Sequence, residues 1–179
     1  MIILGLDPGT ATTGYGVVVY DGVSAHYIAH GCIVTAKTEL PARRLHEIAK
    51  QLGVILRQYQ PDLVAVEELF FMRNVTTAMS VSQARGVLLQ TAAAAKLPVY
   101  SYTPLQVKQA IVGYGRADKS QVQKMVKMIL GLPSIPKPDD AADALAIAIT
   151  CAHSYTLEQT LKWLLVSPAQ FNPKDSIGC

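Results

Sequence analysis

The residues best suited to chemistry are acids at the ends of apolar segments. Asp7 closes the first apolar run of the chain and Glu67 closes a later one, while Asp140 and Asp143 begin a third. Their spacing of three puts both Asp side chains on one side of a helix. A carboxylate in apolar surroundings is costly unless it is paired or binds metal. Mg²⁺ prefers carboxylate oxygens, so the four acids predict a site for a pair of Mg²⁺ ions, which supports in-line phosphoryl chemistry.

The two acids at strand ends also have simpler interpretations. Asp7 could cap the turn Pro8-Gly9-Thr10 that follows it, because acids are common in turns. Glu67 is followed directly by Glu68, and one of the two is expected to be a solvated charge at the end of a strand.

The acids near residue 140 have structural alternatives as well. Asp139 is most simply a helix N-cap, a position that favours Asp, and Asp140 could share that role. Asp143 lies past the first turn among Ala and Leu, so capping does not explain it. The four acids therefore remain candidates whose roles depend on the fold.

The hydrophobic pattern predicts the elements that position these acids. Strands are expected over residues 1–7, 15–20, 25–35, 63–67 and 99–102, and helices over 41–60, 75–96, 104–112, 120–130, 139–153 and 156–166. The first three strands are joined by short turns and should be antiparallel. The last two follow helical crossovers and should be parallel. The result is an α/β fold with a mixed sheet and helices on its faces.

Two helix starts carry capping-box patterns. Thr103 with Gln106 opens one helix, and Ser120 with Gln123 is expected to open the next. The helix over 75–96 has few charges and is expected to be buried on more than one face. That burial could come from the core of the domain or from a dimer interface.

Composition fits a single soluble domain. The chain has 179 residues, 50% hydrophobic and 16% charged, with a net charge of +3. Residues 103–138 alone carry +5. We expect one domain over 1–155, an extra helix over 156–166 and a disordered tail over 167–179. Three scattered cysteines give no zinc or disulfide pattern, and no signal peptide or membrane span is expected, so a cytoplasmic location is predicted.

Several segments, in order, resemble the motifs of the RuvC family of Holliday-junction resolvases. They are GLDPGTATTGYG, VAVEELFF, QARGVLLQ, QVKQAIVGYGRADKSQVQKMV and DDAADALAIAIT, and together they span roughly residues 1–153. The resemblance implies a ribonuclease-H-like five-stranded mixed sheet flanked by helices. It also implies a Mg²⁺-dependent crossover junction endodeoxyribonuclease of homologous recombination and DNA repair. Such an enzyme acts as a homodimer beside a branch-migration helicase and nicks four-way DNA junctions symmetrically.

The resemblance assigns roles to single residues. Asp7, Glu67, Asp140 and Asp143 match the metal ligands, with two Mg²⁺ expected and Mn²⁺ able to substitute, and Lys119 would stabilise charge at the scissile phosphate. Hydrolysis would leave 5′-phosphate and 3′-hydroxyl ends. The expected DNA contacts combine family positions, where Phe70 acts on bases, with basic or polar neighbours: Phe70, Arg73, Asn74, Lys108, Arg116, Lys119 and Lys124.

Departures from the family pattern and rival functions stay open. Some relatives carry Gln at the position of Glu68 and His at that of Asp140, and Asp139 adds a fifth carboxylate. Lys124 could equally belong to a solvated helix face. One rival is a nucleotide-binding protein of the actin and sugar-kinase type, which opens with a similar Asp-x-Gly-Thr turn but needs a second lobe. The other is a junction-binding module without catalysis.

Overall fold

The computed structural model describes residues 1–68 and 75–166, and its side chains are described for 1–68 and 78–155. One five-stranded sheet has the order β3-β2-β1-β4-β5. Its strands are β1 (Ile2–Asp7), β2 (Thr12–Tyr20), β3 (Ala25–Val34), β4 (Leu63–Glu67) and β5 (Val99–Tyr102). β1, β2 and β3 pair antiparallel, whereas β1 with β4 and β4 with β5 are parallel. The predicted mixed sheet is therefore confirmed.

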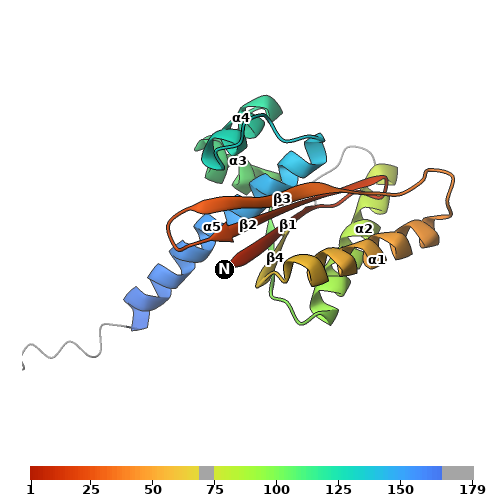
Figure 1. Cartoon of the computed structure of the whole chain (residues 1–179), viewed down its shortest axis with the longest axis horizontal. Coiled ribbons are helices and arrows are strands. Elements are labelled where there is room, and N and C mark those ends of the chain that lie inside the picture. Colours follow the sequence, from red (N-terminus) through yellow and green to blue (C-terminus); the bar gives the residue numbers. More distant parts are fainter. Residues whose placement is uncertain (69–74, 167–179) are drawn as a thin grey trace, which may run out of the picture.

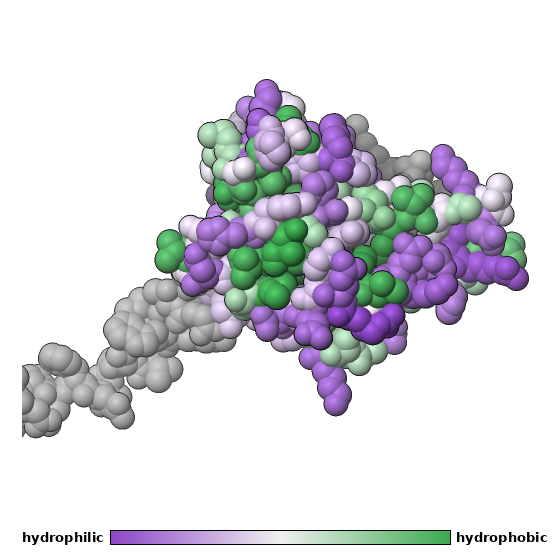
Figure 2. All heavy atoms as spheres, in the orientation of Figure 1, coloured by the Kyte–Doolittle hydropathy of each residue, from purple (hydrophilic) through white to green (hydrophobic). Residues whose placement is uncertain are grey.

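Helices cover both faces of this sheet (Figure 1). The helices α1 (Pro41–Tyr59) and α2 (Val75–Ala94) share one apolar core with the sheet. The helices α3 (Pro104–Val112), α4 (Lys119–Ile129) and α5 (Asp139–Val166) share the other. The apolar stripe of α1 turns inward and its hydrophilic side chains turn outward, as the purple surface along α1 in Figure 2 shows.

Alternation along the strands separates these two cores. On β1, Leu4 and Leu6 belong to the α1–α2 core, and Ile3 belongs to the core with α5. Successive side chains of a strand point to opposite faces. By the same alternation, Asp7 shares the α5 face with Ile3.

Glycines seat α5 unusually close to the sheet. A Cβ added to Gly5 would lie 2.1 Å from the carbonyl oxygen of Ala144, and one on Gly16 would lie 2.6 Å from the Leu145 nitrogen. A Cβ on Gly14 would lie 2.0 Å from the carbonyl oxygen of Asp140. Only a residue without a side chain permits this approach, so the three glycines fix where α5 begins over the sheet.

Three predicted helix boundaries need correction. The cap of α4 is Asp118, which forms the capping box with Gln121, so the helix starts at Lys119 and not at Ser120. Asp118 with Gln121 and Ser120 with Gln123 both satisfy the spacing of the motif. In the structure Gln123 is a buried residue within the helix and not part of its capping box. The capping box of Thr103 and Gln106 is confirmed.

The second and third corrections concern α5. Asp139 is its first helical residue rather than its cap, since the amide of Ala141 donates to the carbonyl of Pro138. The helix also continues without a break to Val166, where a separate helix over 156–166 was expected. The predicted disordered tail over 167–179 lies outside the described residues. Within the described residues, none of the helices has both the length and the apolar character that crossing a membrane requires.

Candidate active site

Two of the candidate acids end neighbouring parallel strands. The register pairs Leu6 of β1 with Val66 of β4, and Asp7 and Glu67 are the next residue of each strand. Parallel strands in register bring equivalent ends to one edge of the sheet. The two carboxyl groups accordingly lie close enough to affect each other's titration.

The turn after Asp7 is held by other residues. The hydroxyl of Thr13 donates to the carbonyl of Gly9 at 2.6 Å, and the hydroxyl of Thr35 donates to the carbonyl of Thr10. A Cβ on Gly9 would lie 2.2 Å from the carbonyl oxygen of Thr12, so this tight turn requires glycine. The charges that act on the carboxyl of Asp7 come instead from the other three candidate acids and from Lys119.

The start of α5 brings the other two acids to Asp7. Gly14 pairs with Asp7 in the sheet and allows the backbone of Asp140 to lie directly against β2. The charge of Asp143 acts on Asp7 more strongly than that of Asp140. Asp143 lines the same pocket as Glu67. The four predicted acids therefore form one electrostatic group, with Asp140 at its margin.

This gathering of acids changes how Asp7 titrates. Burial raises the pKa of Asp7 to about 8, and the charges of Glu67, Asp143 and Asp140 add to the increase. Burial and Asp143 also raise the pKa of Glu67. Asp7 therefore keeps its proton at neutral pH when no cation is bound.

Lys119 is the cation that pairs with this group among the described residues. Its Nζ lies 2.8 Å from Oδ2 of Asp143 and 3.8 Å from Oδ2 of Asp139. Burial lowers the pKa of Lys119, but the hydrogen bond to Asp143 and the surrounding acids raise it overall. Conversely, burial raises the pKa of Asp143 although Lys119 opposes the increase.

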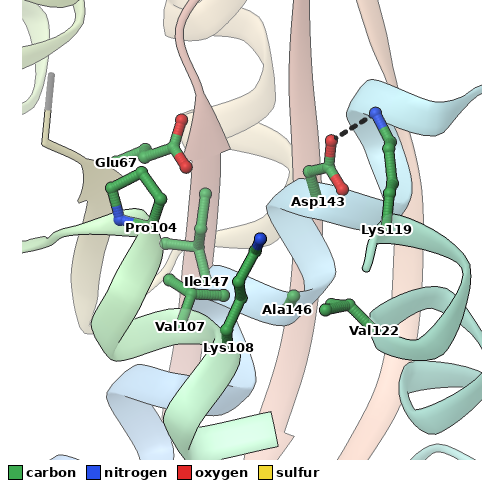
Figure 3. Close-up of a pocket in the computed structure, with 9 residues that line it drawn as sticks. All are labelled: Glu67, Pro104, Val107, Lys108, Lys119, Val122, Asp143, Ala146 and Ile147. Atoms are coloured by element: carbon green, nitrogen blue, oxygen red, sulfur yellow. Dashed lines mark ion pairs between the residues drawn. The ribbon is translucent and has the colours of Figure 1, made fainter. Parts of the chain in front are cut away.

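A pocket of about 250 Å³ opens between these elements (Figure 3). Glu67 and Asp143 line it from opposite sides, Lys119 from α4 bonds to Asp143, and Lys108 from α3 points into the space between the two acids. Carboxylates and lysines thus share one open hollow, which suits a substrate that carries phosphate.

The remaining predicted contacts are spread along the basic segment or lie outside the described residues. Arg116 is exposed in the connection between α3 and α4, and Lys124 is exposed on α4. Phe70, Arg73 and Asn74 fall in the part of the chain that the structure does not describe. Glu68 is exposed, as expected for one of the two adjacent glutamates.

Sequence reasoning missed Arg85 of α2. Its Nε donates to the backbone carbonyl of Glu67 at 3.0 Å, and its second guanidinium nitrogen donates to the hydroxyl of Ser101 at 2.8 Å. Arg85 therefore ties the ends of β4 and β5 together behind Glu67. A signal was present, because Arg85 is the one charged residue in the 20 residues of α2.

The thiol nearest the site is not reactive. Burial and the charge of Asp140 raise the pKa of Cys32 to about 11, so this thiol stays protonated at neutral pH. The thiolate is the form that attacks electrophiles and binds metals. The chemistry of this site therefore rests on oxygen ligands.

The acid group fits a hard divalent cation after one local change. Four interacting carboxylates face one close lysine, and a bound cation would relieve the repulsion that raises the pKa of Asp7. Among the side chains described, however, no three Asp, Glu, His or Cys residues stand close enough to hold one ion. Asp143 is paired with Lys119. If that ion pair opened, the carboxylate of Asp143 would be free to bind a cation together with Asp7 and Glu67.

Comparison with known proteins places this geometry in a family. The family model described as crossover junction endodeoxyribonuclease RuvC matches residues 3–151. The chain is 56% identical over 163 residues to the protein of that name from Syntrophomonas wolfei, covering 90% of this chain and 94% of the relative. It is 58% identical to the one from Desulfitobacterium hafniense, covering 88% and 95%.

A solved structure agrees with these relatives. Thermus thermophilus RuvC in complex with a Holliday junction substrate has 40% identity and a TM-score of 0.83, covering 88% of this chain and 96% of that one. The expected ribonuclease-H-like sheet is the fold that the two share. The chain belongs to the RuvC family of crossover junction endodeoxyribonucleases.

Proposed function

We propose that this chain is a divalent-metal-dependent endonuclease that resolves four-way DNA junctions by symmetric nicking in homologous recombination and DNA repair. The observation that carries the proposal is the convergence of acids from β1, β4 and α5 on Asp7, beside the Lys119–Asp143 pair. A cluster of this kind fits metal-assisted hydrolysis of a phosphodiester, whereas mutually repelling acids would not stabilise the fold.

The metal ligands would be Asp7, Glu67, Asp140 and Asp143, and Mg²⁺ is the ion that their oxygen atoms suit best, with Mn²⁺ able to replace it. When bound, a pair of such ions activates water and stabilises the leaving oxygen. Asp7 must lose its proton before it binds a cation, so its pKa of about 8 ties cation binding to proton release.

The basic residues have separate tasks in this proposal. Lys119 would stabilise negative charge on the scissile phosphate, and Lys108, which lines the same pocket, would orient the DNA backbone. Arg116 and Lys124 are exposed along the same basic segment and would add salt-dependent contacts to the arms. The products would carry 5′-phosphate and 3′-hydroxyl ends.

A homodimer is part of the proposal, because symmetric nicking needs two sites related by a two-fold axis. The one charged residue of α2, Arg85, points inward to Glu67 and Ser101. Ala84, Leu88 and Ala92 pack into the domain, whereas Met79 is 63% exposed. The exposed side of α2 thus carries Met79 among uncharged residues such as Ser82, Gln83 and Gln90, and an uncharged face of this kind suits contact with a second copy. Sedimentation of wild type and Met79→Glu tests this, and an unchanged dimer in the variant would exclude this face.

The activity test uses a labelled synthetic four-way junction with Mg²⁺, beside a linear duplex and an Asp7→Asn control. We expect paired nicks on opposite strands of the junction, no cleavage of the duplex, and a rate at least about a thousandfold lower in the variant. Binding without cleavage, with Mg²⁺ or Mn²⁺ and over varied sequences, would favour a junction-binding module instead. A branch-migration helicase is the expected partner, and a pull-down on junction DNA tests it.

A further inference from the structure

Resting on the proposed function, we propose that Asp139 is a positioning residue: it holds Lys119 over the pocket when Asp143 turns away to bind the divalent cation. The starting observation is that Asp143 has two competing uses. In the structure its Oδ2 is 2.8 Å from Nζ of Lys119, yet a cation site needs this same carboxylate. Lys119 and the cation therefore compete for Asp143.

Asp139 is placed to receive the lysine that Asp143 releases. The two acids are four residues apart on α5, so they lie one turn apart on the same side of the helix. Nζ of Lys119 is already 3.8 Å from Oδ2 of Asp139, and a small movement of a long side chain would close that distance. The exchange keeps Lys119 charged, paired and within reach of the pocket.

A second lysine orients Asp139 for this task. Nζ of Lys137 lies 2.8 Å from Oδ1 of Asp139, which leaves Oδ2 facing Lys119. The chain of ion pairs thus runs Lys137–Asp139–Lys119–Asp143. Asp143 is 30% exposed and Asp139 is 47% exposed, so the lysine would move toward the more exposed of the two acids.

The exchange explains why Asp143 is held away from Asp7 and Glu67 when no cation is bound. Lys119 takes the place of part of the missing positive charge and draws Asp143 from Asp7 and Glu67. The cation then displaces Lys119, and Asp139 prevents the released lysine from competing for Asp143 again. Removal of Asp139 should therefore weaken cation binding through Lys119, in addition to any general loss of negative charge.

A double-mutant cycle separates the specific effect from the general one. Binding of Mn²⁺ is measured without DNA by electron paramagnetic resonance of the free ion, for wild type, Asp139→Asn, Lys119→Met and the double variant. Glu68→Gln is the charge-matched control for Asp139, because Glu68 is exposed beside Glu67. Lys108→Met is the control for Lys119, because Lys108 lines the same pocket.

We expect Asp139→Asn to weaken Mn²⁺ binding about fivefold in the presence of Lys119, and no more than Glu68→Gln does in the Lys119→Met background. Lys119→Met should bind Mn²⁺ more tightly than Lys108→Met, although it cleaves more slowly. In junction cleavage, Asp139→Asn should lower kcat about fivefold and leave KM unchanged.

Two other results would overturn the proposal in distinguishable ways. Equal effects of Asp139→Asn with and without Lys119 would mean that Asp139 acts only through its negative charge and not through Lys119. That result would overturn the exchange but would not contradict the proposed nuclease activity. Absence of Mn²⁺ binding by the wild-type protein would remove the cation site itself, and with it both the exchange and the proposed function.

Discussion

The two faces of the sheet are built on different rules. On the α1–α2 face, β1 and β4 present bulky apolar side chains such as Leu4, Leu6 and Val66, which fill an ordinary core. On the α5 face the same strands present Gly5 and Ala65 before they end in acids. The small residues let α5 lie against the sheet, so that Asp140 and Asp143 reach Asp7. The α1–α2 face is packed with bulky side chains. The α5 face has small residues where α5 crosses β1 and β4, and this allows the charged groups to come together.

The largest effect should come from breaking the close approach of α5. In Gly5→Ala the new Cβ would meet the Ala144 carbonyl at 2.1 Å and the Ala148 nitrogen at 2.7 Å, so the helix must move. We expect a loss of about 3 kcal/mol in the free energy of unfolding. Displacement of Asp143 should also slow cleavage more than about tenfold. Urea denaturation and single-turnover cleavage at low temperature measure the two effects.

The matched change on the other face is Leu4→Ala. It leaves a cavity in the α1–α2 core and should cost a similar amount, about 3 kcal/mol. Because α5 is not displaced, the folded variant should cleave within about threefold of wild type. Equal losses of activity in the two variants would show that the faces do not differ in this way.

The next effect concerns the buried charge on the α5 face. The pKa of Asp7 is raised from 3.8 to about 8 in the folded protein, so the folded state holds a proton that the unfolded chain loses between those pH values. The stability of the metal-free wild type should therefore fall as pH rises from about 4 to about 8 and then level off. Asp7→Asn lacks this loss, so its stability relative to wild type should rise between about pH 4 and about pH 9.

Urea denaturation at a series of pH values in a chelator measures that difference. Asp62→Asn is a suitable control, because its exposed carboxylate accepts from the amide of Ile2 at the opposite end of β1. A constant difference between wild type and Asp7→Asn over the whole pH range would mean that Asp7 titrates normally.

A smaller effect should follow from removing the hydrogen bonds by which a side chain of α2 reaches the end of β4. Arg85 reaches from α2 to the carbonyl of Glu67 and to Ser101. Arg85→Met should loosen the end of β4 and lower kcat about fivefold, with junction affinity unchanged. Lys96→Met removes an exposed charge just past the end of α2 and serves as control. If junction binding weakened as much as cleavage, Arg85 would act on DNA rather than on Glu67.

The smallest effect is expected one residue beyond the site. Glu68 is exposed, and its backbone amide donates to the carbonyl of Tyr102. Glu68→Gln removes a solvated charge and should change cleavage by less than about twofold at moderate salt, with slightly tighter junction binding at low salt. Cleavage rates over a range of salt concentrations test this. A tenfold change at moderate salt would bring Glu68 into the site.

Much of the fold was predictable because its signals are local. The strand ending in Asp7, the helix beginning at Pro41 and the capping box at Thr103 each depend on residues close in sequence. Where two local signals competed, prediction failed: Asp118 and Ser120 both fit a cap, and the structure uses Asp118. The continuation of α5 past Ser154 was missed for a related reason, since nothing local marks either a break or its absence.

The sequence by itself determined which residues are able to do chemistry: the acid at each strand end, the pair three residues apart, and the basic segment before them. Residue type and spacing carry that information. Tertiary structure alone decided how these groups meet, with α5 seated on glycines, Lys119 paired with Asp143 instead of standing free, and Arg85 fastened behind Glu67. Those contacts join residues far apart in the chain, and their distances follow from how closely the elements pack.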